Sequence, residues 1–226
     1  MCGRYSLFSK ASTINDEFQI RDSVVLAPRY NIAPIQDAPV VRAEDGKRRS
    51  LSLLRWGLVP SWAKDKTIGN RMINARAETV AEKPSFKSAL QKRRGTIPAD
   101  GFYEWKQTEQ GRQPYFIQLH SRSLLGLAGL WERWTNKEGQ AIESFAIITT
   151  EANDFMRPIH DRMPVILDRN YYEQWLNCRD YDGQQVGHLL KPCSSDLLKM
   201  YSVGKQVNSP GNDSRVCIQQ WSGSVS

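Results

Sequence analysis

The sequence lacks the features that mark secreted and membrane-spanning proteins. Its start has no apolar signal-peptide core, and no run approaches the about 18 apolar residues that a spanning helix needs. Its cysteines have neither the CxxC spacing of a zinc site nor the density of a disulfide framework. They are Cys2, Cys178, Cys193 and Cys217. We therefore expect a cytoplasmic protein that binds no metal.

Glycine-rich nucleotide loops and internal repeats are absent as well. No GxGxxG or Walker sequence occurs, so nothing in the sequence predicts a nucleotide cofactor. The prolines and glycines are spread along the chain without a low-complexity linker. A chain of 226 residues buries roughly 70% of its unfolded surface in one core. We expect a monomer with one domain over residues 1–226, whose tail at 219–226 is frayed.

Basic residues outnumber acidic ones. The 31 lysines and arginines and the 24 acidic residues give a net charge of +7, which favours polyanionic partners. Two basic runs, at residues 46–50 and 91–95, are interpreted as solvated turns rather than binding sites.

Short β-rich runs recur, whereas helical stretches are fewer. The strand candidates are residues 38–43, 50–59, 94–105, 114–120, 124–134, 144–150 and 164–167. The helix candidates are residues 78–93, broken near Pro84, then 151–160, 168–177 with Asp168 as a cap, and 194–201. Strands with intervening short helices, but without regular βαβ alternation, predict an α+β fold around a mixed sheet or barrel.

The position of Cys2 directly after Met1 permits unusual chemistry. A small second residue favours removal of Met1, which would leave an α-amine and a thiol on neighbouring carbons. Their ordinary pKa values, near 8 and near 8.5, leave a reactive fraction of each group at neutral pH. Such an aminothiol can form a Schiff base with an aldehyde and close to a thiazolidine, or attack an amide. Alternatively, Cys2 is simply a small buried apolar residue.

Three further stretches carry polar residues suited to catalysis. In an extended "RMINARAET", Asn74, Arg76 and Glu78 share one face, as binding groups or as a solvated strand edge. In "PADGFYEWK", Gly101 would allow a tight turn, and aromatic neighbours would desolvate Glu104 unless it is exposed. In "PIHDRMP", His160 lies in a loop stiffened by prolines, suited to proton transfer or to a structural role.

Two proline-containing stretches, "RYNIAPIQ" and "RWGLVPSWAKD", are expected to form loops. Pro34 and Trp62 could stack on nucleic-acid bases there, whereas Tyr30 and Trp56 are assigned to the core.

In order along the chain, these stretches resemble the SRAP family, the SOS-response-associated peptidases. The motifs that carry the resemblance are "MCGRY", "RYNIAP", "WGLVPSWAKD", "INARAET", "PADGFYEWK", "HDRMPVIL" and, more weakly, "VNSP". The resemblance implies a single compact α+β domain with a mixed, largely antiparallel β-barrel-like core and peripheral short helices. It also implies covalent capture of abasic sites in single-stranded DNA, and nucleoid association when the protein is bound to DNA.

The resemblance also implies roles for individual residues. After loss of Met1, the Cys2 amine forms a Schiff base with C1′ of the opened abasic sugar, and its thiol closes a thiazolidine. Asn74 orients Cys2, Glu104 transfers protons, and His160 helps to open the sugar and to reverse the crosslink. The implied DNA contacts are Arg4, Arg76, Arg162, Pro34 and Trp62.

Two other functions compete with covalent capture. In the first, Cys2 is the nucleophile of a peptidase or hydrolase, with removal of Met1 by the protein itself as its minimal reaction. In the second, the protein shields single strands without forming a bond and would tolerate Cys2→Ala. Both DNA-binding functions would weaken with salt.

Overall fold

The computed structural model describes residues 2–21, 25–44, 46–121 and 123–223. The strands are β1 (Tyr5–Leu7), β2 (Arg29–Ile32), β3 (Asp37–Glu44), β4 (Arg48–Trp56), β5 (Asn74–Arg76), β6 (Arg94–Ala99), β7 (Gly101–Thr108), β8 (Gly111–Leu119), β9 (Leu125–Thr135), β10 (Ala141–Glu151), β11 (Arg162–Pro164), β12 (Ile166–Leu167) and β13 (Leu198–Ser202). The α-helices are α1 (Ala11–Phe18), α2 (Lys87–Lys92) and α3 (Tyr172–Leu176). The 3-10 helices are η1 (Lys66–Arg71), η2 (Arg169–Tyr171), η3 (Gly187–Leu189), η4 (Ser195–Leu197), η5 (Lys205–Asn208) and η6 (Arg215–Ile218).

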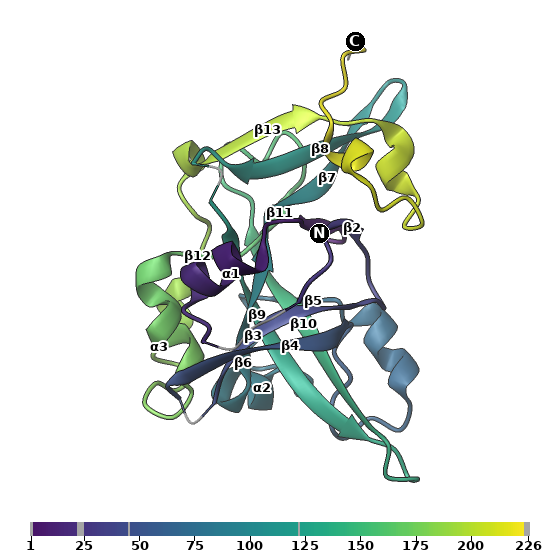
Figure 1. Ribbon diagram of the computed structural model, residues 1–226. Helices are drawn as coiled ribbons and strands as arrows, with labels where there is room; N and C mark the ends of the chain where they lie inside the picture. The colour runs from purple at the N-terminus through teal and green to yellow at the C-terminus, as the bar shows by residue number, and fades with distance from the viewer. Residues whose placement is uncertain (1, 22–24, 45, 122, 224–226) are drawn as a thin grey trace.

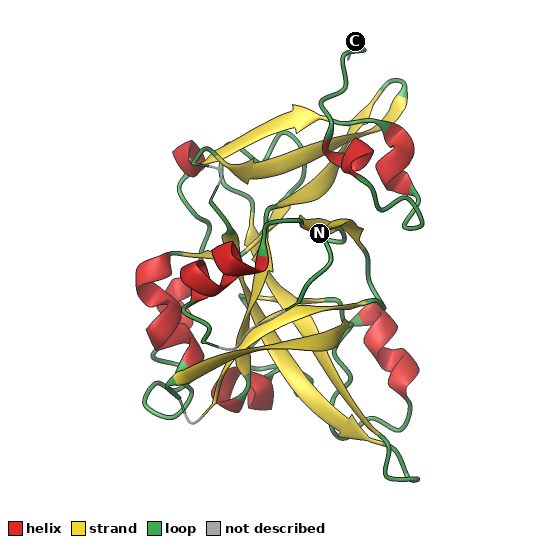
Figure 2. Cartoon of the chain, in the orientation of Figure 1, coloured by secondary structure: helices red, strands yellow, loops and turns green. Residues whose placement is uncertain are grey.

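A closed barrel forms the larger part of the fold. Within the described residues, β10, β4, β3, β6 and β9 pair in a ring, with β10–β4 parallel and the other pairs antiparallel. A second sheet, in the order β13-β8-β7-β1-β2, lies above the barrel in Figure 1. Helices lie outside the strands (Figure 2). The expected α+β fold with a mixed, largely antiparallel barrel and peripheral short helices is confirmed.

The barrel core explains why several strands are almost continuously apolar. The first half of β9 is buried on both faces, because one face lines the core and the other is covered by neighbouring segments. At Gly129 on β9, an added Cβ would overlap the end of the Ile97 side chain and lie 3.0 Å from the Ala146 carbonyl oxygen, so the segments pack closely here. Each fully buried large apolar side chain contributes about 1.5–3 kcal/mol.

The predicted strand runs fall on strands, although 94–105 contains two of them, β6 and β7. The expected loop over "RYNIAPIQ" is wrong at its start, where Arg29–Ile32 form β2 by pairing with β1.

The helix predictions agree only in part. The segment 168–177 contains η2 and α3, and the Asp168 carboxylate accepts a hydrogen bond from the Asn170 amide at 2.9 Å. In 78–93, only Lys87–Lys92 is α-helical, after a series of turns that contains Pro84. Helix α1, without a side-chain cap, was not predicted.

One predicted helix is wrong, and another is helical only near its start. Of residues 151–160, Glu151 ends β10 and 154–159 form turns, because the Asn153 carboxamide accepts the Met156 amide and Pro158 lacks a backbone donor. Within the helix expected at 194–201, Ser195–Leu197 form the 3-10 helix η4. The chain from Leu198 on belongs to β13, since pairing with the edge of β8 satisfies its backbone. Gly101 begins β7 rather than a tight turn: its added Cβ would lie 2.6 Å from the Ile117 carbonyl oxygen.

The beginning of the expected frayed tail is bound. Gln220 forms a bridge with Val203, and the Trp221 amide donates to the Ser202 carbonyl at 2.7 Å. Residues 224–226 lie outside the described part of the chain. Among the described residues, no helix is long and apolar enough to cross a membrane.

The interpretation of the basic runs as solvated turns is wrong at two positions. Arg49 is 7% exposed and donates to the Phe18 carbonyl oxygen at 3.1 Å. Arg94 is 1% exposed, lies over the Trp175 ring, and donates to backbone carbonyls, including those of Leu90 and Tyr181 at 2.8 and 2.6 Å. These arginines join distant segments of the fold.

Replacement of Arg94 by methionine should destabilise the protein by about 3 kcal/mol or more, because it leaves several buried carbonyl oxygens without a donor. Urea unfolding of Arg94→Met and wild type measures the loss. Lys92→Met, an exposed position in the same basic run, is the matched control and should change the free energy of unfolding by less than about 0.5 kcal/mol. Equal stability of the two variants would contradict this assignment.

Candidate active site

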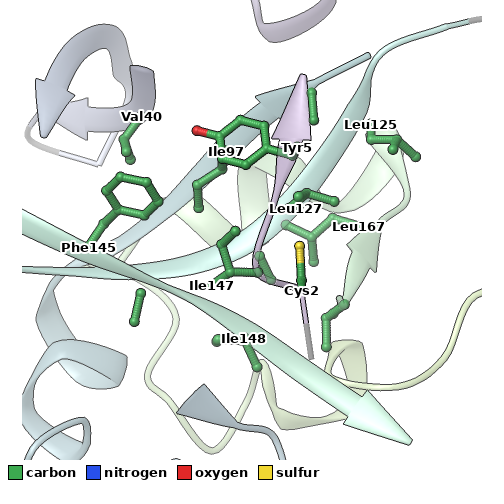
Figure 3. Close-up of a cluster of buried hydrophobic side chains, with 14 of the residues drawn as sticks. Cys2, Tyr5, Val40, Ile97, Leu125, Leu127, Phe145, Ile147, Ile148 and Leu167 are labelled. Carbon is green, nitrogen blue, oxygen red and sulfur yellow. The ribbon is translucent and has the colours of Figure 1, made fainter. Parts of the chain in front are cut away.

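Strand pairing holds Cys2 inside the molecule. Strand β1 pairs with β2 on one side and with β7 on the other, so Cys2, three residues before β1, is fixed beside both sheets. Its side chain is fully buried in the main apolar cluster. Figure 3 shows its sulfur among the apolar side chains of this cluster, which include Leu127, Ile147 and Leu167.

This environment strongly changes the Cys2 thiol. Burial raises the pKa of the thiol far above its ordinary value, and the negative charge of Glu104 raises it further. The thiol is therefore protonated at neutral pH, and the apolar wall limits its reaction with reagents from solvent. Cys2 thus has the apolar environment expected for a buried cysteine. It also has a charged neighbour, Glu104, as expected for a reactive cysteine.

Asn74 lies on β5, which pairs in parallel with β10 through Ile147. Its side-chain nitrogen Nδ2 donates to the Cys2 carbonyl oxygen at 2.9 Å. Its oxygen Oδ1 is buried and accepts no hydrogen bond from the described residues. The alternation expected in this stretch is present, since Ala75 is buried and Arg76 is exposed, but Glu78 lies in the turn after β5.

Glu104 lies on β7 and is 3% exposed, so the alternative of an exposed strand residue is wrong. Burial raises the pKa of the carboxyl group to about 7, and the charge of Asp161 also raises it. Both protonation states are consequently populated at neutral pH. Because the Glu104 charge acts on the Cys2 thiol and Asp161 acts on Glu104, the loop of His160 and Asp161 belongs to the same electrostatic environment.

His160 lies in the loop that leads into β11. The Arg162 backbone amide donates to its Nδ1 at 2.9 Å, which places the proton of the neutral ring on Nε2. The Asp161 carboxylate also lies 2.8 Å from Nδ1, a contact that requires a proton there. The two contacts belong to different protonation states. We assign the neutral ring, because burial lowers the pKa of His160 and the Asp161 side chain is 86% exposed to screening solvent.

Two of the three arginines implied as DNA contacts bind protein groups. Arg4 donates from Nη1 to Asn31 Oδ1 at 2.7 Å and to the Val207 carbonyl oxygen at 2.6 Å. Through these bonds it joins the beginning of the chain to the segment that contains the "VNSP" motif. The Arg162 guanidinium forms a bidentate ion pair with Glu78. Arg76, in contrast, is exposed on β5.

The implied base contacts lie on two loops outside the barrel. Trp62 is 58% exposed beside a cleft of about 700 Å³, which Lys64 and Arg71 also line. Pro34 is half-buried at the turn between β2 and β3. The next residue, Ile35, is 53% exposed and has a φ of 76°, a conformation rare for a β-branched residue. The sequence analysis missed Ile35, because no local pattern signals this conformation.

A second cleft, of about 940 Å³, lies between the β8–β9 connection and the segments around Tyr171 and Lys191. Among the described residues that line it, none is one of the implied site residues. Within the described ranges, no group of three or more His, Cys, Asp or Glu side chains is arranged to hold a metal ion.

Comparisons with known proteins agree on one family. A family model described as SOS response associated peptidase (SRAP) matches residues 1–210. Abasic site processing protein YoqW of Bacillus subtilis is 44% identical over 223 residues, covering 97% of this chain and 99% of that protein. Abasic site processing protein HMCES of Gallus gallus is 32% identical over 222 residues, covering 84% of this chain and 66% of that protein. A crystal structure of a Bacteroides thetaiotaomicron protein superposes with a TM-score of 0.87 at 27% identity, covering 97% of this chain and 100% of that one.

Proposed function

The chain belongs to the SOS response associated peptidase (SRAP) family, and on that premise we propose that it processes abasic sites in single-stranded DNA through a covalent bond to Cys2. The observation that carries this proposal is the fixed position of Cys2. Asn74 binds its carbonyl oxygen, and the charge of Glu104 acts on its thiol. The names of the relatives, which describe abasic site processing, supply the substrate class.

The reaction begins with the loss of Met1, which lies outside the described residues. While Met1 is present, the nitrogen of Cys2 is an amide and is not nucleophilic. After its removal, the α-amine attacks C1′ of the ring-opened abasic sugar, and loss of one water gives a Schiff base. The thiol then adds across the C=N bond: sulfur bonds to carbon, the thiol proton passes to nitrogen, and a thiazolidine results. The amine acts first because the thiol is protonated and buried.

Glu104 and His160 are proposed to carry out different proton transfers. Glu104, with a pKa of about 7, can accept a proton from the attacking amine and return it to the departing hydroxyl group. His160 presents Nε2–H in its neutral form, which suits donation to the sugar ring oxygen during opening, and the reverse transfer assists crosslink reversal. Asn74 orients Cys2 through the carbonyl bond. The chemistry requires no cofactor.

Single-stranded DNA is proposed to approach across the exposed Arg76 and the loops of Pro34 and Trp62. The net charge of +7 favours a polyanion, and each base stacked on an aromatic side chain contributes about 1–3 kcal/mol. Arg4 also remains a proposed contact to the DNA backbone, although it already binds protein groups. A contact from Arg162 to the DNA backbone would require phosphate to displace the Glu78 carboxylate.

Covalent capture is tested by mixing protein lacking Met1 with a single-stranded oligonucleotide that carries one abasic site. We expect a band that survives a denaturing gel, and an intact mass equal to protein plus DNA minus one water. Borohydride should not be required for this band, because the thiazolidine is stable without reduction.

Two oligonucleotides of the same sequence provide the controls. One carries an intact base, and the other carries a tetrahydrofuran analogue that lacks the aldehyde; neither should give the band. Absence of the band with the true abasic site, once loss of Met1 is verified by mass, would reject covalent capture. Salt-dependent binding without a bond would then indicate a shielding protein, whereas cleavage of peptides or of Met1 by the purified protein would indicate a peptidase.

A further inference from the structure

We propose that Glu78 is a positioning residue of this site, which acts through Arg162 to hold the strand of Asn74 and the loop of His160 in place relative to each other. This inference rests on the proposed function and extends it to a residue that does not itself touch the reacting atoms. It also gives Arg162 a task other than binding DNA phosphate.

The contact between Glu78 and Arg162 is a bidentate ion pair. Arg162 Nη1 donates to Glu78 Oε1 at 2.7 Å, and Nη2 donates to Oε2 at 3.0 Å. The side chain of Arg162 is 16% exposed and that of Glu78 is 48% exposed. The arginine bond lowers the pKa of the Glu78 carboxyl group, which therefore stays ionised at neutral pH. Bidentate pairing of this kind fixes both the distance and the angle between the groups.

The pair bridges two strands that flank β10. Arg76 of β5 lies opposite Thr149 of β10, and Pro164 of β11 lies opposite the same residue. Strands β5 and β11 therefore flank β10 at Thr149. Arg162 Nη2 also donates to the Thr149 carbonyl oxygen at 2.6 Å. The guanidinium group thus joins the turn after β5, the middle strand and the beginning of β11.

Each end of this bridge leads directly to a residue of the candidate site. Asn74, which binds the Cys2 carbonyl oxygen, begins the strand that ends two residues before Glu78. On the other side, the backbone amide of Arg162 donates to His160 Nδ1 and thereby sets which ring nitrogen carries the proton. A shift of Arg162 would consequently move the imidazole and change its tautomer.

A phosphate contact would compete with this arrangement. Arg162 already directs both terminal nitrogens to the Glu78 carboxylate, so a phosphate in the same plane would have to displace it. If DNA did so, removal of the Glu78 charge would strengthen binding. If the pair positions the site, removal of that charge would slow the reaction of bound DNA and leave affinity nearly unchanged. The two roles therefore predict opposite results.

The variant Glu78→Gln keeps the shape of the side chain and removes its charge. We expect the rate of covalent product formation at saturating abasic DNA to fall by about tenfold or more, because small displacements of reacting groups have effects of this size. The DNA concentration at half-saturation and its dependence on salt should stay within about twofold of wild type. Glu82→Gln, an exposed position later in the same turn region, is the matched control and should behave as wild type.

A second measurement needs no DNA. The ¹⁵N chemical shifts of the His160 ring report its tautomer, which in wild type should be the Nε2–H form. Glu78→Gln should show a mixture of tautomers, and Glu82→Gln should not. Wild-type ring shifts together with a wild-type rate at saturation would overturn the proposal, as would tighter DNA binding by Glu78→Gln with an unchanged rate. If wild type itself forms no covalent product, the proposed function fails, and the ring shifts alone decide whether Glu78 positions His160.

Discussion

Cys2→Ala should form no covalent product that survives denaturation. Alanine is also small, so Met1 is still removed and the α-amine remains, but no sulfur is available to close the ring. The Schiff base then hydrolyses when the protein unfolds. Borohydride added before denaturation should trap it, and the trapped adduct should run at the position of the wild-type product. The loss of untrapped product should be complete within the detection limit of the gel.

The matched control is Cys193→Ala, which removes a half-buried thiol elsewhere in the chain and should leave the product unchanged. Protein that keeps Met1, identified by intact mass, should give neither a stable nor a trapped adduct, because its Cys2 nitrogen is in a peptide bond. A stable adduct in Cys2→Ala would place the bond on another residue and exclude the thiazolidine.

Glu104→Gln should slow formation of the covalent product by about 10²–10⁴-fold, the usual range for loss of a positioned proton-transfer group. In wild type, the rate should change with pH around 7, where the Glu104 carboxyl group titrates. Glutamine cannot titrate, so the variant should lose this inflection. Single-turnover rates between pH 5 and 9 measure both effects.

Glu109→Gln, exposed at the turn between β7 and β8, is the control. An inflection that persists in Glu104→Gln would assign the proton transfer to another group.

Glu104→Gln should slow the reaction, but it should become more stable relative to wild type as the pH rises. The pKa of Glu104 is raised from 4.5 to about 7 by folding, so the folded protein holds this proton more tightly than the unfolded chain. Its favourable contribution is complete below pH 4.5 and is lost as the pH rises through 7. Relative to wild type, Glu104→Gln should therefore gain roughly 3 kcal/mol of unfolding free energy between pH 4.5 and pH 8. Denaturant unfolding at the two pH values, with the same N-terminal form in both proteins, tests this gain.

The sequence predicted the long barrel strands well because their apolar runs have to be buried whatever the topology, but it missed short strands such as β1 and β2. It failed for helices where a neighbouring group decides the local conformation. Residues 198–202 are a strand because β8 offers an open edge, and 154–159 are turns because the Asn153 side chain caps them. Arg94 belongs to a basic run, and only packing against Trp175 and several backbone carbonyls makes it a core residue.

For the candidate site, the sequence by itself determined which groups are present. A thiol next to Met1, an amide, a carboxylate and an imidazole follow from the residue types, and the motifs indicated the family. The tertiary structure alone decided their environments. Strand pairing buries Cys2 and joins it to Asn74, burial raises the pKa of Glu104, and the ion pair with Glu78 occupies Arg162. These properties arise between segments far apart in the chain, because desolvation and charge depend on spatial neighbours rather than on adjacent residues.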